Sequence, residues 1–398
     1  MFSVDGLIEN YYPSFGKTNS FTRKQFVSFL RTLFHESEIQ QFEKKYSHLT
    51  GFDFIDEVLK YFDFTYKISG RDLERIPSHG RVIIVANHPL GTLDGLALLN
   101  LVRKVRPDVK AVANEFLSCF EAYDPVLLPI DNMAGKTPRE NLKNIKNYLQ
   151  QDSAVIIFPA GEVSRMGPNG VRDGKWNKGF IRFAKDTQSP VLPIHVDGRN
   201  SMFFYALSIV ARPLSTLWLI HEMFKQNKNT IEFKVGEKVE YETYSELKFT
   251  TAEVAQMFRR HLYRVGKKRK PIFKTRESIA QPENAQQLRK ELQECELLGE
   301  TADNKKMYLF RYQSNTAIMR EIGRLRELSF RAVGEGTSSS RDIDAYDRNY
   351  MHLILWDEDE LEIAGAYRFC DTNMTMSLHG IDGIYTSSLF SFNSDMSN

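Results

Sequence analysis

The sequence predicts an α/β domain followed by a smaller α+β unit. Three short runs rich in β-branched residues, at 81–86, 154–158 and 190–196, are typical of strands buried on both faces. Segments with apolar residues at helical spacing alternate with these runs, and this alternation indicates a sheet covered by helices. The 398 residues are enough for two or three domains of ordinary size.

The composition excludes several classes of protein. Apolar residues make up 42% of the chain, with 28 Phe and 17 Tyr, so a disordered chain is excluded. The 53 basic and 51 acidic residues nearly cancel, which argues against a nucleic-acid partner. Cys119, Cys295 and Cys370 are odd in number and far apart, so they predict neither a disulfide framework nor a metal site, and they fit a reducing cytosol.

Patterning along the chain predicts four regions. Helices are expected in residues 1–63, because residues 21–34 and 56–62 place apolar side chains at helical intervals. The α/β domain is expected over residues 64–265. Residues 266–287 are polar and partly basic, as in a linker, and a second unit with a helix and a hairpin is expected over 288–398.

Residues 202–220 form the only stretch close to membrane length. Arg212 lies at its centre, and an Arg at the bilayer midplane costs at least about 2.5 kcal/mol, so a membrane span is rejected. The stretch is expected to be core, an acyl-chain groove or a membrane-docking surface. Trp218 and the basic residues in 259–270 favour docking on an anionic membrane. Residues 1–16 show no signal-peptide pattern, so the expected location is cytoplasmic, peripheral on the inner face of the cytoplasmic membrane.

The segment most informative about chemistry is residues 87–95, Asn-His-Pro-Leu-Gly-Thr-Leu-Asp-Gly, directly after the first predicted strand. His88 is expected in a turn, and Asp94, in the first turn of the next helix, can reach back to it. A carboxylate on one ring nitrogen leaves the other nitrogen as a general base near neutral pH. A substrate hydroxyl can then attack an acyl thioester without a protein nucleophile. In the plainer interpretation, Asp94 only complements the helix dipole.

Two further blocks follow in order. Residues 158–165 read Phe-Pro-Ala-Gly-Glu-Val-Ser-Arg, and residues 191–194 read Val-Leu-Pro-Ile. With Asn87, His88 and Asp94, this ordered set resembles the glycerolipid (lysophosphatidate-type) acyltransferase superfamily. The resemblance implies a lysophospholipid-acyltransferase-like fold, His88 and Asp94 as catalytic residues, and a lysolipid acceptor. It also implies acyl-acyl carrier protein or acyl-CoA as the donor, with no bound cofactor and no metal.

The chain departs from the family pattern in several places. Five residues separate His88 from Asp94 where the family has four, although a glycine at position 91 can absorb the extra residue. Ala160, Val163 and Asn132 stand where the family has a Glu and two Arg. Because a bidentate Arg is the usual phosphate ligand, these changes predict an acceptor without a glycerol phosphate.

Alternatively, the acceptor carries a phosphate that Arg139, Arg165 or Lys178 binds in place of the missing arginines. The residues expected to contact the substrate are Asn87, Gly161, Glu162, Arg165, Arg139 and Lys178.

Residues 288–383 resemble the N-terminal half of the GNAT-type, acyl carrier protein-dependent ornithine N-acyltransferases. The fusion resembles bifunctional ornithine lipid synthases, and this implies lyso-ornithine lipid as the acceptor. A GNAT fold needs a Gly-rich loop at a helix N-terminus to hold the donor's pyrophosphate. After Glu360 the only glycines are Gly365, Gly380 and Gly383, and none begins such a loop. The second unit is therefore expected to be a partial GNAT domain that does not catalyse alone.

Three alternatives stay open. The chain could acylate 1-acylglycerol phosphate or another lysophospholipid, or it could be a catalytically silent lipid-binding protein. His195 and Asp197 could form a second catalytic pair, although an ordinary histidine at a strand end is the favoured interpretation.

Overall fold

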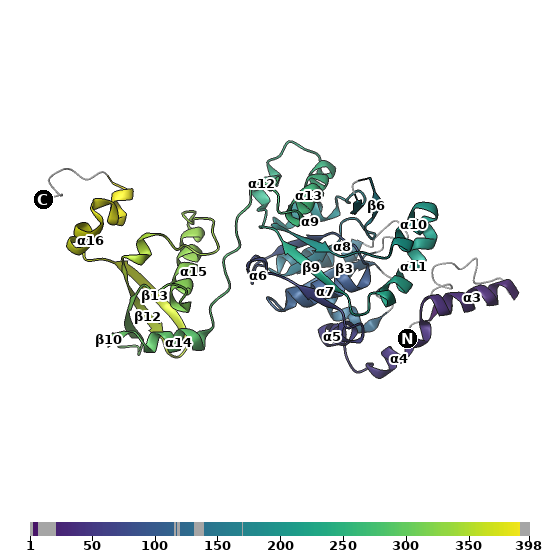
Figure 1. Ribbon diagram of the computed structural model, residues 1–398, viewed down its shortest axis with the longest axis horizontal. Helices are drawn as coiled ribbons and strands as arrows, with labels where there is room; N and C mark the ends of the chain where they lie inside the picture. Colours follow the sequence, from purple (N-terminus) through teal and green to yellow (C-terminus); the bar gives the residue numbers. More distant parts are fainter. Residues whose placement is uncertain are drawn as a thin grey trace. The chain divides into compact units, whose positions relative to one another are not determined.

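The structure is a computed structural model that describes residues 3–6, 21–114, 117, 120–130, 139–168 and 170–390. It divides into two compact units, Met1–Arg276 and Glu277–Asn398 (Figure 1). The boundary falls inside the polar stretch 266–287, for which the sequence predicts a linker. Each unit has its own sheet and its own apolar core.

The first unit is built on a seven-stranded sheet in the order β1-β9-β8-β2-β5-β3-β4. Its strands are β1 (Thr65–Lys67), β2 (Val82–Ala86), β3 (Val109–Asn114), β4 (Leu127–Ile130), β5 (Ala154–Ile157), β8 (Val191–Asp197) and β9 (Thr230–Val235). Neighbouring strands are parallel except β8 and β9, which are antiparallel. Ala86 lies opposite Ile194, and Val85 lies opposite Ile157. The carboxyl ends of β2, β5 and β8 therefore share one edge of the sheet, where ligand sites of α/β proteins form.

Helices cover both faces of this sheet (Figure 1). One face packs against α5 (Gly51–Tyr61) and α7 (Thr92–Arg103), and the other packs against α8 (Arg139–Gln150), α9 (Gly179–Thr187), α12 (Tyr241–Ser245) and α13 (Thr251–Gly266). Along β2, Ile84 enters the first core, whereas Ile83 and Val85 enter the second. All five residues of β2 are buried, which explains why the strand is apolar without alternation. The predicted α/β class is confirmed.

Two pairs of helices lie outside these layers. They are α3 (Phe21–Leu33) with α4 (Glu36–Lys45), and α10 (Met202–Val210) with α11 (Arg212–Lys225). Val27 and Leu30 of α3 pack against Leu217 and Ile220 of α11. Ala211, with a φ of −144°, separates α10 from α11. None of the helices in the described ranges has both the length and the apolar composition needed to cross a bilayer.

The stretch 202–220 is only partly core. Phe204 and Tyr205 are buried, but Met202, Phe203, Ile209 and Val210 expose between 53% and 86% of their surface. The interpretation of the whole stretch as core is therefore wrong. One side of α10 packs on the protein, and the other side meets solvent with apolar side chains.

The second unit contains a four-stranded antiparallel sheet in the order β10-β11-β12-β13. The strands are β10 (Glu296–Glu300), β11 (Lys306–Arg311), β12 (Met351–Asp357) and β13 (Glu362–Phe369), and the helices are α14 (Ala285–Gln293), α15 (Ala317–Ala332) and α16 (Thr372–His379). Tyr308, Phe310, Ile354 and Trp356 of the sheet pack with apolar residues of α14 and α15. The predicted α+β architecture of this unit is confirmed.

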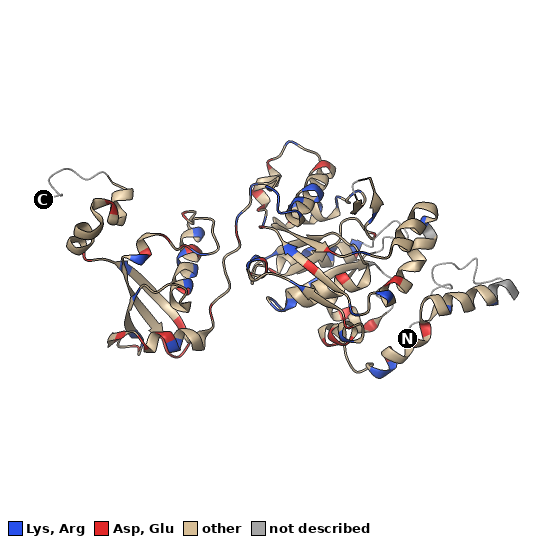
Figure 2. Ribbon diagram, viewed as in Figure 1, with Lys and Arg blue, Asp and Glu red and all other residues tan. Residues whose placement is uncertain are grey.

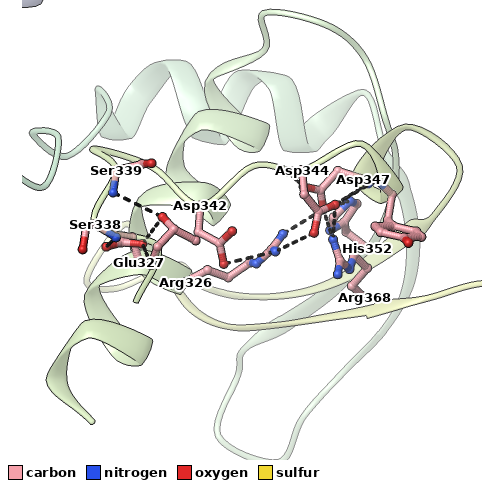
Figure 3. A network of polar contacts seen from close by, with 11 residues as sticks. Arg326, Glu327, Ser338, Ser339, Asp342, Asp344, Asp347, His352 and Arg368 are labelled. Carbon is pink, nitrogen blue, oxygen red and sulfur yellow. Dashed lines mark hydrogen bonds and ion pairs between the residues drawn. The ribbon is translucent and has the colours of Figure 1, made fainter. Parts of the chain in front are cut away.

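The long loop between α15 and β12 is fixed by buried charges (Figure 3). Arg326 of α15 donates to Asp347 at 2.8 Å and lies 3.2 Å from Asp342. Arg368 of β13 donates to Asp344 at 2.7 Å and to Asp347 at 2.9 Å. Asp347 is fully buried and joins both arginines. A loop with one short 3₁₀ turn is thus held to a helix and a strand by side chains.

Candidate active site

The turn that follows β2 is tied to the end of β8 by Asn87. The side-chain amide of Asn87 donates to the carbonyl oxygen of Val196 at 2.8 Å, and its Oδ1 accepts the N–H of Val196 at 2.8 Å. Asn87 is 3% exposed. The structure therefore gives Asn87 a positioning role, and its contact with substrate stays a prediction.

His88 and Asp94 meet as the sequence predicts. The Nδ1 of His88 lies 3.0 Å from the Oδ1 of Asp94, which is fully buried. The Oδ2 of Asp94 accepts the backbone N–H of Leu90 at 3.0 Å, so the same carboxylate also closes the turn. The extra residue of the motif is accommodated at Gly91, whose φ of +108° disfavours any side chain.

The surroundings of His88 favour a general base. Burial lowers the pKa of His88, but the charges of Asp94 and Asp173 outweigh burial, so that the pKa is raised above 6.5. The ring stacks on Phe158 at a centroid distance of 4.2 Å. With Nδ1 against Asp94, Nε2 is the nitrogen left to take a proton. The side chain is 22% exposed, so a substrate can reach it.

Asp173 is a residue of the site that the sequence analysis missed. Its Oδ1 accepts the N–H of His88 at 3.2 Å and the hydroxyl of Ser164, and its Oδ2 accepts the indole N–H of Trp176 at 2.8 Å. The N–H of Ser164 in turn donates to the carbonyl oxygen of His88 at 2.7 Å. Burial raises the pKa of Asp173 above its usual 3.8, although these hydrogen bonds oppose the rise. Asp173 positions the turn, and no motif in the sequence marks it.

The second block forms a bridge to α11. Gly161 turns the chain after β5 with a φ of +68°. Glu162 lies 3.2 Å from Arg165 and also pairs with Arg212 of α11, while Arg165 donates to the Ser215 hydroxyl at 2.7 Å. Burial raises the pKa of Glu162, but the two arginines outweigh burial and lower it. The side chain of Arg212 is 62% exposed, so this bridge leaves one accessible cation.

The other two residues predicted to bind substrate are Arg139 and Lys178. Arg139 and Lys178 lie at the starts of α8 and α9 and are exposed. Within the described ranges, neither forms a hydrogen bond or ion pair with His88 or Asp94. Their role in binding stays a prediction. Asn132 and Cys119 lie outside the described residues.

His195 and Asp197 do not form a second pair like His88 and Asp94. The ring of His195 contacts that of Tyr263, and burial lowers the pKa of His195 to about 4. The carboxylate of Asp197 lies 4.0 Å from Lys234. The described part of the chain also contains no cluster of three or more His, Cys, Asp or Glu side chains suited to hold a metal ion.

An apolar cavity begins beside the catalytic turn. It has a volume of about 90 Å³ and lies among α4, α5, α11 and the 3₁₀ helix η2 (Glu121–Val126). Its walls include Phe42, Phe54, Phe62 and Phe224. Thr92, the first residue of α7, also lines it, two positions before Asp94.

Comparison with known proteins shows the family to which the chain belongs. A family model described as acyltransferase matches residues 16–270, which include the turn, both blocks and Asp173. The chain belongs to this acyltransferase family. A second model, described as acetyltransferase (GNAT) domain, matches residues 325–398.

Curated relatives of the acyltransferase include two O-acyltransferases and an N-acyltransferase. It is 31% identical over 257 residues to the lyso-glycine lipid O-acyltransferase of Phocaeicola vulgatus, over 63% of this chain and 91% of that protein. It is 31% identical over 272 residues to the protein of the same name from Bacteroides thetaiotaomicron, over 67% of this chain and 97% of that protein. The glycine N(alpha)-acyltransferase of B. thetaiotaomicron is 40% identical over 121 residues, or 29% of this chain and 36% of that protein.

Among solved structures, the acyltransferase is similar to the 1-acyl-sn-glycerophosphate (LPA) acyltransferase PlsC from Thermotoga maritima. The TM-score is 0.36 at 16% identity, and the match covers 66% of this chain and 93% of that one. The predictions of an acyltransferase enzyme and of a GNAT unit are confirmed. None of the relatives described above is named for ornithine, so the predicted ornithine headgroup is not shown.

Proposed function

We propose that the acyltransferase transfers a fatty acyl group to the hydroxyl of an amino-acid lysolipid, and that the acceptor is lyso-glycine lipid. The names of the O-acyltransferase relatives support the glycine headgroup over the lyso-ornithine lipid favoured by the sequence resemblance. An acceptor of this class, N-(3-hydroxyacyl)glycine, has a hydroxyl for acylation and a carboxylate at its head.

The charge at the mouth of the site is the observation that carries this proposal. Glu162 lies between Arg165 and Arg212, and these three side chains leave one positive charge in excess. The exposed guanidinium of Arg212 suits a headgroup carboxylate, which it can bind through two hydrogen bonds. An ornithine headgroup adds an ammonium group, which needs a carboxylate as its partner. Glu162 is already paired with two arginines, and Asp94 is buried behind His88, so neither carboxylate is available.

In the proposed reaction, the Nε2 of His88 takes the proton of the acceptor hydroxyl. The oxygen then attacks the thioester carbonyl carbon, the carbon–sulfur bond breaks, and the leaving thiolate recovers the proton from His88. Asp94 stabilises the imidazolium, and Asp173 holds the turn in place. The donor is the acyl thioester of acyl carrier protein or of CoA, and the apolar cavity beside Thr92 has room for part of its acyl chain.

The exposed apolar side of α10 and α11 is the proposed membrane contact. Figure 2 shows α10 without charged residues, and Met202, Ile209, Val210 and Leu214 each expose more than half of their surface. An exposed apolar patch of this kind marks an interaction surface. Since Arg212 of α11 pairs with Glu162, the membrane contact and the site are adjacent. The acceptor then enters from the inner face of the cytoplasmic membrane.

Acceptor competition tests the proposal. The purified full chain is supplied with lyso-glycine lipid, lyso-ornithine lipid or 1-acylglycerol phosphate in identical micelles, with acyl-CoA and acyl-acyl carrier protein in parallel. We expect the highest kcat/KM for lyso-glycine lipid. Arg212→Gln should lower that preference, whereas Arg260→Gln, an exposed arginine on α13, should not. A preference for 1-acylglycerol phosphate would contradict the proposal.

The catalytic assignment has its own test. We expect His88→Ala to lower acyl transfer by about 10²-fold or more, the lower range for loss of a general base. The variant should fold, because His88 lies in a turn and its backbone makes the bonds to Asp173 and Ser164. Full activity of His88→Ala would contradict the assignment of His88 as the general base. Absence of turnover in the wild type with every acceptor and donor would favour a silent lipid-binding protein.

A further inference from the structure

The first unit contains a second cavity, which several charged residues line and which has a volume of about 350 Å³. Its walls are α6 (Gly70–Glu74), the end of β9, the end of α13 and the segment that follows α13. Val235 of β9 lies opposite Ile194, which lies opposite Ala86. The cavity is therefore two strand spacings from β2, about 10 Å, and β9 leads away from the edge that carries His88. Cavities of this size hold small ligands.

Basic residues predominate in the cavity wall. The charged residues that line it are Arg71, Arg75, Lys234, Lys268 and Arg269 against Asp72 and Glu237. Both carboxylates are engaged within the protein: Asp72 accepts the N–H of Val235 at 3.1 Å, and both lie 3.5 Å from Arg75. The positive charge of Lys234 is partly balanced by the carboxylate of Glu232, which lies 3.3 Å away. The wall thus keeps an excess of positive charge after its internal pairs are counted.

Lys268 and Arg269 contribute most of this excess. In the described part of the molecule, the side chain of neither residue forms an ion pair or hydrogen bond, and both are exposed. Their backbone is nevertheless fixed, because the N–H of Arg269 donates to the carbonyl of Arg264 at 2.9 Å. A competing explanation is that these cations only complement the carboxyl end of α13. That explanation accounts for the two charges but not for the cavity beside them.

His261 supplies an independent observation in the same wall. The residue is 1% exposed, and its Nδ1 accepts the backbone N–H groups of Ile272 at 3.1 Å and Phe273 at 3.4 Å. The ring hydrogen is therefore on Nε2. That nitrogen has no hydrogen-bond partner among the described atoms. A buried donor without a partner is rare, and this one belongs to a residue that lines the cavity.

We propose that this cavity binds a phosphate group, with Lys268 and Arg269 as its charged ligands and His261 as a neutral donor in the wall. The guanidinium of Arg269 can donate two parallel hydrogen bonds to phosphate, and Lys268 adds a compact charge. The volume leaves room for part of the molecule that carries the phosphate. The source of the phosphate is a soluble phosphorylated compound or an anionic lipid headgroup. This site is separate from the proposed acyl transfer.

A matched pair of double variants tests the site. Lys268→Gln/Arg269→Gln removes the two lining cations, and Lys267→Gln/Lys270→Gln removes the same charge from neighbours that do not line the cavity. Binding of inorganic phosphate and of pyrophosphate to the full chain is measured by calorimetry. We expect Kd to rise about tenfold or more in the lining variant, as for loss of a charge-assisted hydrogen bond, and to stay within about twofold in the control.

The same variants are tested on vesicles of phosphatidylcholine with and without phosphatidic acid. Weaker binding in the lining variant alone supports the proposal in either assay, and the assay that responds identifies the source of the phosphate. Circular dichroism verifies that both variants fold. The Nε2–H signal of His261 in the nuclear magnetic resonance spectrum should shift when phosphate is added to the wild type. Equal weakening in both variants, or binding in neither assay, would overturn the proposal.

Discussion

Asp94 is the residue on which the catalytic turn depends. One of its oxygens lies against His88, and the other accepts the N–H of Leu90. A change at this position therefore disturbs the base and the backbone of the turn together. Asp173 is different, because its contacts to His88 are through the backbone N–H and through charge.

Asp173 allows the charge effect to be tested by the pH dependence of activity. Its charge contributes to the raised pKa of His88, so Asp173→Asn should lower that pKa. A general base acts when it is deprotonated, so kcat/KM rises as the pH passes this pKa. We expect the rise to occur at lower pH in Asp173→Asn. Asp197→Asn, which removes an exposed carboxylate on β8, should leave the profile unchanged. An unshifted profile in Asp173→Asn would contradict the role given to Asp173.

At the scale of elements, α10 and α11 link the surface to the site. Their exposed apolar residues are available to lipid, and their buried residues include Phe204 and Tyr205 beside Val163 of the second block. The loop between α15 and β12 has the opposite character, because its Asp342, Asp344 and Asp347 are paired with arginines and Asp347 is fully buried.

The double variant Ile209→Ser/Val210→Ser tests the membrane contact. Both side chains are more than 70% exposed, so their loss should not affect folding. Burial of one such side chain stabilises by about 1.5–3 kcal/mol, so we expect at least about tenfold weaker binding to anionic vesicles. Co-sedimentation measures the binding. Val333→Ser, equally exposed in the second unit, serves as the control. Unchanged sedimentation of the double variant would exclude this surface.

The charged network of the second unit predicts a stability effect. Asp347→Asn leaves Arg326 and Arg368 without the carboxylate that joins them (Figure 3). Loss of one partner of a buried ion pair costs about 3 kcal/mol or more. We expect the urea midpoint of this unit to fall and hydrogen exchange in its loop to accelerate. Asp359→Asn, in an exposed turn, should change neither.

At the scale of the whole molecule, buried histidines set the response of the first unit to acid. Burial lowers the pKa of both His195 and His261 to about 4. Below about pH 6.5 the unfolded chain binds protons that the folded unit does not, so stability falls as the pH drops toward 4. His88 acts in the opposite direction, because its pKa is raised.

This balance leads to a measurable prediction. The urea midpoint of the first unit should decrease between pH 7 and pH 4, because the histidines whose pKa is lowered, which also include His221, outnumber His88. His195→Gln should make the decrease shallower, because the variant lacks one of the histidines that bind a proton more readily in the unfolded chain than in the folded unit. A midpoint that is constant over this range in the wild type would contradict the prediction.

The sequence predicted those parts of the molecule that have a local pattern. The apolar run of β2 and the spacing from His88 to Asp94 can be read in a few neighbouring residues. Asp173 could not be predicted, because it reaches His88 from 85 positions away and stands in no recognisable motif. The exposure of α10 could not be predicted either, because an apolar helix has the same composition in a core and at a surface.

The antiparallel direction of β9 has a consequence for kinetics. Because β9 runs against β8, the chain leaves the sheet on the side away from the catalytic edge, and there it forms the wall of the basic cavity. Two ligands can thus be held at once without sharing a side chain or a loop. An occupant of the basic cavity would therefore not compete directly with the lysolipid for its site.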